Sequence, residues 1–149
     1  MPMLRFTEII TGEHEIYDTL TLSFDQRVKS RLKVMLDKGE AAGLFLPRAS
    51  QLLDGTQIRA ETGEVVEIRA ATEPVSTAHV KDPLLMARAC YHLGNRHLAL
   101  QIGEGFLRYQ HDHVLDDMLR GLGLSVISEQ APFQPEAGAY GSNSHAHEH

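Results

Sequence analysis

Apolar and polar residues alternate along several short stretches of the first half of the chain. Leu20, Leu22 and Phe24 alternate with polar neighbours, and residues 32–36 repeat this pattern. A period of two predicts strands, because successive side chains of a strand point to opposite faces. Further strands are predicted over 43–46, 57–60 and 65–71, with turns at 37–40, 54–55 and 62–63. Many short strands at close spacing predict a small all-β sandwich or barrel-like domain over residues 1–72.

The pattern changes near Glu73, where strands begin to alternate with helices. Asp82 followed by Pro83 predicts a helix start, and Gly94 is placed to cap the end of that helix. A second apolar helical stripe ends at Gly123. Strands are predicted around the two helices, over 75–80, 98–102, 106–110 and 124–129. The order β-α-β-β-α-β predicts a ferredoxin-like α+β domain over residues 73–131. Residues 132–149 are rich in Pro, Gly, Ala and Ser, which predicts an extended or disordered tail.

Composition narrows the classes of function. The chain has 149 residues and a net charge of −6, with its Lys and Arg scattered, so a nucleic-acid partner is not expected. No apolar run approaches the ~20 residues of a membrane span, and the start lacks the pattern of a signal peptide, so a cytoplasmic protein is expected. Cys90 is the single cysteine. It lies on the apolar stripe of the first helix and is expected to be a core thiol.

Histidine is enriched, with nine residues, and His97 is the first candidate ligand. It precedes the predicted strand of Leu98, Leu100 and Ile102, and would share the opposite face with Ala99 and Gln101. In a ferredoxin-like fold that face carries no helix, so a two-fold dimer could bring two copies of His97 together. The alternative is a histidine whose charge is stabilised near a helix C-terminus. Spacing alone favours this alternative.

His111 and His113 form a second candidate group, and they flank Asp112, a predicted helix N-cap. The two imidazoles are either metal ligands or part of a polar junction, and spacing does not separate these interpretations. Asp116 and Asp117 follow on the polar face of the predicted helix, where they are expected to be solvated.

The third group is at the end of the chain, where His145, His147 and His149 alternate with other residues. This pattern favours metal binding over a remnant of a purification tag, which would have consecutive histidines. Imidazole binds Ni(II), Zn(II) and Cu(II) alike, so residue types do not name the metal.

Several segments together resemble the urease accessory protein UreE family of nickel metallochaperones. Residues 91–97 (YHLGNRH) and the following 98–102 resemble the family's signature, 107–119 resemble its next block, and 132–140 resemble the stretch before its histidine-rich tail. In the first half, 25–31 and 42–48 are also similar to the family. The resemblance covers roughly residues 17–149.

The resemblance implies a homodimeric chaperone rather than an enzyme. An N-terminal β domain would bind protein partners, and a ferredoxin-like domain would dimerise and bind metal. His97 would carry the principal interfacial nickel site, His111 and His113 further metal, and the tail additional ligands. Ni(II) would pass to the urease accessory GTPase and the apo-urease assembly complex for nickel insertion. The short tail does not support large-capacity storage, and the sequence leaves open whether metal drives assembly to a tetramer.

Two other classes of function are weighed against a chaperone. A metal-dependent hydrolase using His111 and His113 would need three ligands and a general base, but the chain has no HExxH motif. An HxHxD motif is also absent, because Asp116 lies one position too far from His113. A protein-interaction module with incidental metal affinity is the other alternative, and it predicts weak, unselective binding of nickel.

Overall fold

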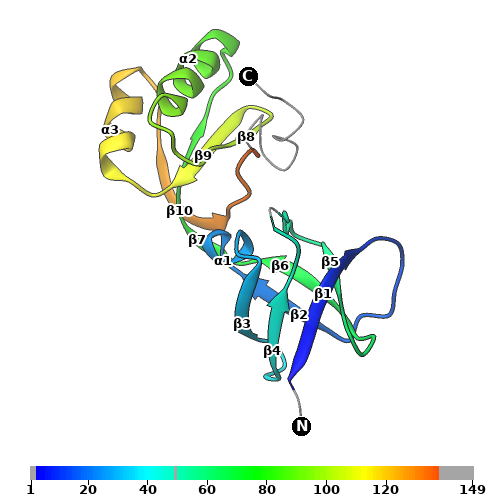
Figure 1. The fold of residues 1–149 in the computed structure, drawn as a ribbon. Coiled ribbons are helices and arrows are strands. Elements are labelled where there is room, and N and C mark those ends of the chain that lie inside the picture. The colour runs from blue at the N-terminus through cyan, green and yellow to red at the C-terminus, as the bar shows by residue number, and fades with distance from the viewer. Residues whose placement is uncertain (1–2, 49, 138–149) are drawn as a thin grey trace. The chain divides into compact units, whose positions relative to one another are not determined.

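The computed structural model describes residues 3–48 and 50–137 (Figure 1). They form two compact units, the first ending at Ala71 and the second starting at Thr72. The histidines His145, His147 and His149 lie outside the described residues. None of the described helices is long and apolar enough to cross a membrane.

The N-terminal unit is a strongly curled six-stranded sheet. Its strands are β1 (Leu4–Ile10), β2 (Asp18–Leu22), β3 (Arg31–Met35), β4 (Ala41–Phe45), β5 (Gln57–Ala60) and β6 (Val65–Ala70), in the order β2-β6-β5-β1-β4-β3. The pairs β1–β4 and β2–β6 are parallel and the others are antiparallel. Apolar side chains from all six strands meet in one core. The predicted all-β, barrel-like domain is therefore confirmed.

Hydrogen bonds around one residue, Asp37, rather than a strand pair close the gap between the edge strands β2 and β3. Thr19 and Thr21 of β2 donate their hydroxyl hydrogens to Oδ2 of Asp37, at 2.6 and 2.8 Å, just beyond β3. The backbone N–H of Asp37 donates in turn to the carbonyl of Thr19 at 3.0 Å. These bonds, the Asp37 clamp, make the sheet a nearly closed barrel.

Two details of this unit differ from the prediction. The strand β1 was not predicted, because its only fully buried side chain is Phe6 and an irregularity between Phe6 and Glu8 interrupts its alternation. Phe24 does not continue β2 but begins the short helix α1 (Phe24–Arg27). Ser23 and Gln26 form a capping box there, in which each side chain bonds the other's backbone N–H. This S-x-x-Q spacing was a signal for the helix that alternation alone concealed.

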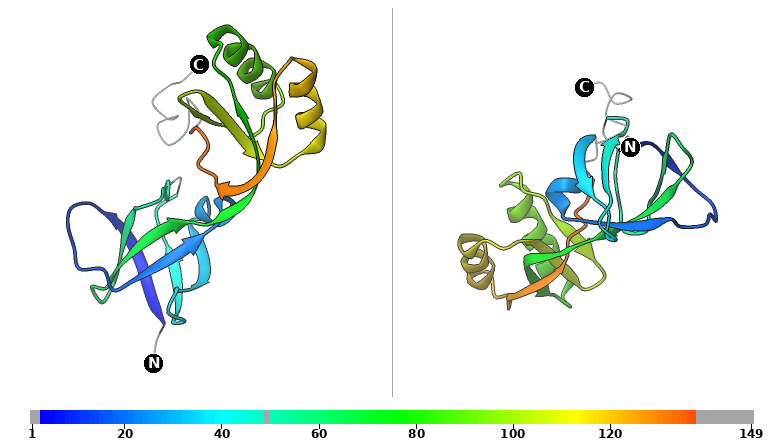
Figure 2. Two further views of the ribbon diagram at one scale, coloured as in Figure 1. Left: turned by 180° about the vertical axis from the view of Figure 1, so that it is seen from behind. Right: turned by 90° about the horizontal axis from the view of Figure 1, so that it is seen from below.

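The C-terminal unit has the predicted β-α-β-β-α-β order (Figure 2). Its elements are β7 (Thr72–His79), α2 (Pro83–Gly94), β8 (Gln101–Gly103), β9 (Phe106–Gln110), α3 (His113–Gly121) and β10 (Ile127–Pro132). The sheet is antiparallel, with the strand order β10-β7-β9-β8. Both helices cover one face, where Ala89 and Leu93 of α2 and Leu115 and Leu119 of α3 join one core with the strands.

The chain after β10 crosses the other face of this sheet. The backbone N–H of Gln134 donates to the side chain of Gln101 at 3.0 Å, and that of Glu136 donates to the carbonyl of Leu100 at 2.7 Å. Residues 133–137 therefore run from the β10 edge to the β8 edge. Arg108 of β9 lies on the same face and bonds Thr77 at 2.9 Å. This face carries no helix, as expected, but residues 133–137 cover part of it.

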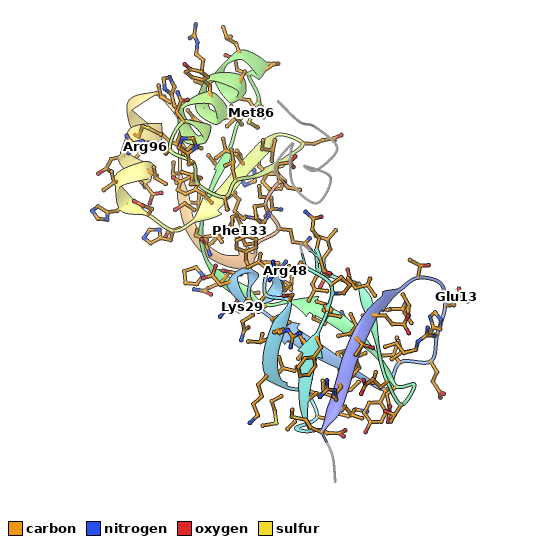
Figure 3. The ribbon with its side chains drawn as sticks, in the orientation of Figure 1. Glu13, Lys29, Arg48, Met86, Arg96 and Phe133 are labelled. Carbon is orange, nitrogen blue, oxygen red and sulfur yellow. The ribbon has the colours of Figure 1, made fainter. Side chains whose placement is uncertain are left out.

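The Asp37 clamp should contribute measurably to stability. We expect Asp37→Asn to lower the free energy of unfolding by about 1–2 kcal/mol, because the bonds from Thr19 and Thr21 lose a charged acceptor. Urea titration followed by circular dichroism measures this. Glu13→Gln removes an exposed carboxylate in the loop between β1 and β2 (Figure 3), and should leave the midpoint unchanged. Equal midpoints for Asp37→Asn and the unsubstituted chain would contradict the role of the clamp.

The carboxylate of Asp37 should also make the stability of the fold depend on pH. Burial alone would raise the pKa of Asp37, but the hydrogen bonds from Thr19 and Thr21 outweigh it and lower the pKa below its usual value. Folding therefore favours the charged form. Its contribution is present above the unfolded carboxyl's pKa of about 3.9 and is lost as pH falls through the lower folded pKa. Urea midpoints measured at decreasing pH across this range should fall less steeply for Asp37→Asn than for the unsubstituted protein.

Candidate metal centre

His97 lies in the turn that ends α2. The helix begins with Asp82, whose carboxylate accepts from the backbone N–H of Leu84 at 3.1 Å, as predicted. It ends at Gly94, and the backbone N–H of His97 donates to the carbonyl of Gly94 at 3.0 Å. His97 has φ of 55°, and among the described residues it is the only one other than glycine with positive φ. A side chain in this left-handed region costs of order 1–3 kcal/mol, and such strain is found most often at functional sites.

This placement corrects the predicted strand over 98–102. The strand β8 begins only at Gln101, so His97 is not on a strand and does not share a face with Ala99 and Gln101. Gly94 is the last helical residue, and the C-cap is Asn95. The physical reason is that the helix is followed by a turn over 95–97, which an alternating apolar pattern does not reveal. His97 itself is exposed.

His111 and His113 flank the start of α3, as predicted. Asp112 is the N-cap, and its Oδ1 accepts from the backbone N–H groups of Val114 and Leu115 at 2.9 and 3.3 Å. His113 is the first residue of the helix and is exposed. His111 links β9 to the cap, and its backbone N–H donates to the carbonyl of Pro74 at 3.2 Å.

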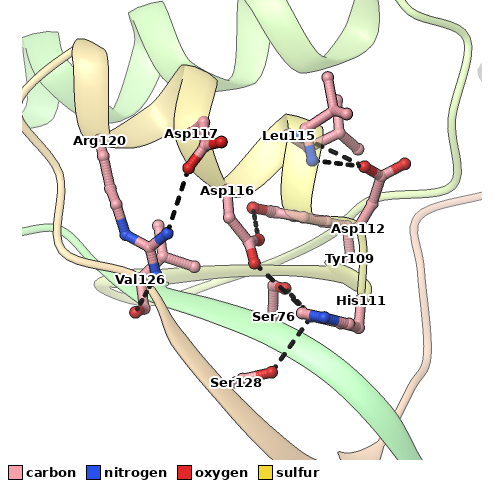
Figure 4. A network of polar contacts seen from close by, with 11 residues as sticks. Ser76, Tyr109, His111, Asp112, Leu115, Asp116, Asp117, Arg120, Val126 and Ser128 are labelled. Carbon is pink, nitrogen blue, oxygen red and sulfur yellow. Dashed lines mark hydrogen bonds and ion pairs between the residues drawn. The ribbon is translucent and has the colours of Figure 1, made fainter.

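The His111 ring is held at its Nδ1 atom (Figure 4). Ser76 of β7 and Ser128 of β10 each place a hydroxyl oxygen 3.1 Å from Nδ1. Asp116 of α3 places Oδ2 3.5 Å from the same atom. Side chains from three different elements, β7, β10 and α3, therefore converge on one ring nitrogen.

Asp116 is buried, with a side-chain exposure of 5%, so the expectation that it is solvated is wrong. Tyr109 donates its hydroxyl hydrogen to Oδ1 of Asp116 at 2.6 Å. Burial, followed by this hydrogen bond, raises the pKa of Tyr109 well above its usual range, so the hydroxyl stays protonated as a donor. Asp116 lies three positions before the core residue Leu119, and that spacing was the signal for its burial. Asp117 is 75% exposed, as predicted.

A hollow of about 280 Å³ lies beside His111. It is lined by Leu98, Ala99, Tyr109, Gln110, His111, Asp112 and Leu115. The segment that directly follows His97 and the segment that contains His111 therefore border one concave surface.

Within residues 3–48 and 50–137, no three His, Cys, Asp or Glu side chains are grouped closely enough to hold a metal ion. His97, His111 and His113 therefore do not form a complete metal site within the described part of one chain. Cys90 is half-buried against the core of this unit. Burial, and next the carboxylate of Glu136, raise the pKa of the Cys90 thiol. It is therefore a poor source of the thiolate that metal binding requires.

Comparison with known proteins decides the family. The model of the UreE urease accessory protein C-terminal domain matches residues 73–149, and that of the N-terminal domain matches residues 6–71. The chain belongs to the UreE family. This is a family of urease accessory proteins rather than enzymes, and membership implies a role in urease maturation.

Relatives named urease accessory protein UreE match over nearly their whole length. The protein of Vibrio parahaemolyticus is 52% identical, over 99% of each chain. That of Alkalilimnicola ehrlichii is 58% identical, over 93% of this chain and 85% of the relative. That of Pseudomonas putida strain W619 is 57% identical, over 97% of this chain and 90% of the relative.

The positive φ at position 97 predicts how substitutions there change the free energy of unfolding. His97→Gly should be more stable than His97→Ala by roughly 1 kcal/mol, because only glycine adopts positive φ without strain. The same pair of substitutions at His92, inside α2, should give the opposite sign, because alanine stabilises a helix interior relative to glycine by about 1 kcal/mol. Urea denaturation of the four variants measures both differences. The same sign at both positions would contradict the left-handed turn.

Proposed function

We propose that this protein carries Ni(II) as cargo on a histidine site shared by two copies of the chain, and delivers it for assembly of the urease active site. The observation that carries the proposal is the position of His97. The imidazole is exposed on a strained turn whose backbone hydrogen bonds fix its place, and the family to which the chain belongs serves urease. The ion is bound only for transfer and takes part in no reaction on this protein.

The incomplete ligand set within one described chain supports sharing between copies. A two-fold axis brings each residue near it against its own copy, so one exposed imidazole would become two. The strained turn supports this role, because it holds the imidazole at a defined point on the surface. The proposed homodimer is centred on this turn, and it does not require an open sheet face.

His111 and His113 are the proposed additional ligands. The hollow between residues 98–99 and His111 is the proposed place where further ligands reach the ion. The histidines at 145, 147 and 149 are proposed to complete or extend the set. Imidazole ligands also accept Zn(II) and Cu(II), so selectivity for nickel would come from geometry and metal supply.

A site of few imidazoles, open to solvent, suits transfer better than a closed four-ligand site does. A partner protein can then supply competing ligands and take the ion. The proposed recipients are the urease accessory GTPase and the apo-urease assembly complex, in the cytoplasm. The N-terminal barrel is the proposed partner-binding domain, and metal-driven formation of a tetramer is an extension of the same proposal.

Nickel titration calorimetry on the full chain tests the His97 site. The unsubstituted protein should show a tightest class of about one ion per two chains, and His97→Gly should lose this class. Glycine relieves the backbone strain, so the loss would report the missing imidazole rather than a damaged turn. His92→Ala, which removes an exposed imidazole from α2, should keep the tightest class.

Light scattering with and without nickel completes the test. The proposal requires that the species that binds nickel most tightly is a dimer. Retention of the full tight stoichiometry in His97→Gly would overturn the His97 assignment. Weak, unselective nickel binding that is unchanged in every variant would favour an interaction module instead.

A further inference from the structure

The His111 ring is partly exposed to solvent. Its contacts with Ser76, Ser128 and Asp116 all involve one of its two nitrogens, Nδ1. The side chain is 43% exposed, yet Nδ1 faces the hydroxyls of Ser76 and Ser128 and the carboxylate of Asp116. The Asp116 side chain is only 5% exposed. Oxygen atoms therefore gather at Nδ1 (Figure 4), and the geometry of the imidazole directs Nε2 away from Nδ1 and its partners.

The position of the carboxylate favours a proton on Nδ1 rather than on Nε2. A carboxylate oxygen accepts hydrogen bonds and cannot donate them, whereas a serine hydroxyl can do either. A lone pair on Nδ1 would face the negative Oδ2 of Asp116, while an N–H at Nδ1 is attracted to it. The hydroxyls of Ser76 and Ser128 can turn to accept from the same N–H.

The hydrogen bonds of Tyr109 are also consistent with a proton on Nδ1. Tyr109 donates to Oδ1 of Asp116 and is also hydrogen-bonded to Ser76. Because the Tyr109 hydrogen points to the carboxylate, Ser76 must donate to the Tyr109 oxygen, which leaves the Ser76 oxygen to accept from Nδ1–H of His111. The donors and acceptors of Tyr109, Ser76 and His111 then follow one another in a consistent order.

We propose that Asp116 is a positioning residue for metal binding: it holds the proton of neutral His111 on Nδ1 and so presents the lone pair of Nε2 outward to the ion. The effect on metal binding rests on the proposed function, whereas the position of the proton rests only on the contacts of His111. A carboxylate behind a metal-binding imidazole fixes the ring and raises the basicity of the ligand nitrogen. In water an imidazole favours the proton on Nε2, so a His111 without Asp116 would have to exchange tautomers before it binds.

Nitrogen NMR of the metal-free protein tests the tautomer directly. With ¹⁵N-labelled imidazoles at mildly alkaline pH, His111 should show a pyrrole-type Nδ1 and a pyridine-type Nε2. Asp116→Asn should reverse this assignment, because the new amide can donate to Nδ1 while its oxygen still accepts from Tyr109. Asp117→Asn, on the adjacent exposed position, should leave the assignment unchanged.

Nickel affinity tests the consequence. Asp116→Asn should weaken the class of sites that depends on His111 by roughly tenfold or more. In a His111→Ala background the same substitution should have no further effect, because a residue that acts through His111 has nothing left to position. An equal loss in both backgrounds would show a merely structural role and overturn the inference.

The two readouts separate this inference from the proposed function. A pyridine-type Nδ1 in the unsubstituted protein overturns the inference, even if Asp116→Asn fails to fold. Nickel binding that depends on His97, with a His111 tautomer insensitive to Asp116→Asn, also overturns it and leaves the proposed function standing. A correct tautomer in a protein that binds no nickel supports the positioning and refutes the proposed cargo.

Discussion

The hydrogen bond between Tyr109 and Asp116 is the interaction on which the candidate site depends. At 2.6 Å it joins the buried end of β9 to α3, and the carboxylate also faces His111. A buried carboxylate costs several kcal/mol unless its oxygens are satisfied. Tyr109 supplies a partner for Oδ1, and the His111 ring lies next to Oδ2. A buried residue of α3 therefore contacts an exposed candidate ligand directly.

The elements that were predicted correctly are those whose signals are local. Asp82 and Asp112 act as N-caps because a carboxylate two residues before a free N–H is sufficient, whatever surrounds it. The βαββαβ order and the tight turns follow from local periodicity in the same way. The fold class of both units was therefore accessible from the sequence alone.

What the sequence did not reveal depends on contacts between distant segments. Phe6 marks a strand only because β4 and β5 pair on either side of it. Asp116 is buried only because β9 and α3 come together. The crossing of the sheet by residues 133–137 depends on a bond from Glu136 to Leu100 that no periodicity indicates. Of the candidate ligands, the junction at His111 and His113 was predicted, whereas the turn at His97 was not.

The left-handed backbone at position 97 also limits which chemistry that position can carry. Asn and Asp tolerate this conformation better than most residues, whereas β-branched and bulky side chains do not. An oxygen donor from Asp or Asn could therefore replace the imidazole without disturbing the turn. Redesign of the surface toward harder cations such as Mn(II) or Mg(II), which prefer oxygen ligands, is therefore compatible with this backbone.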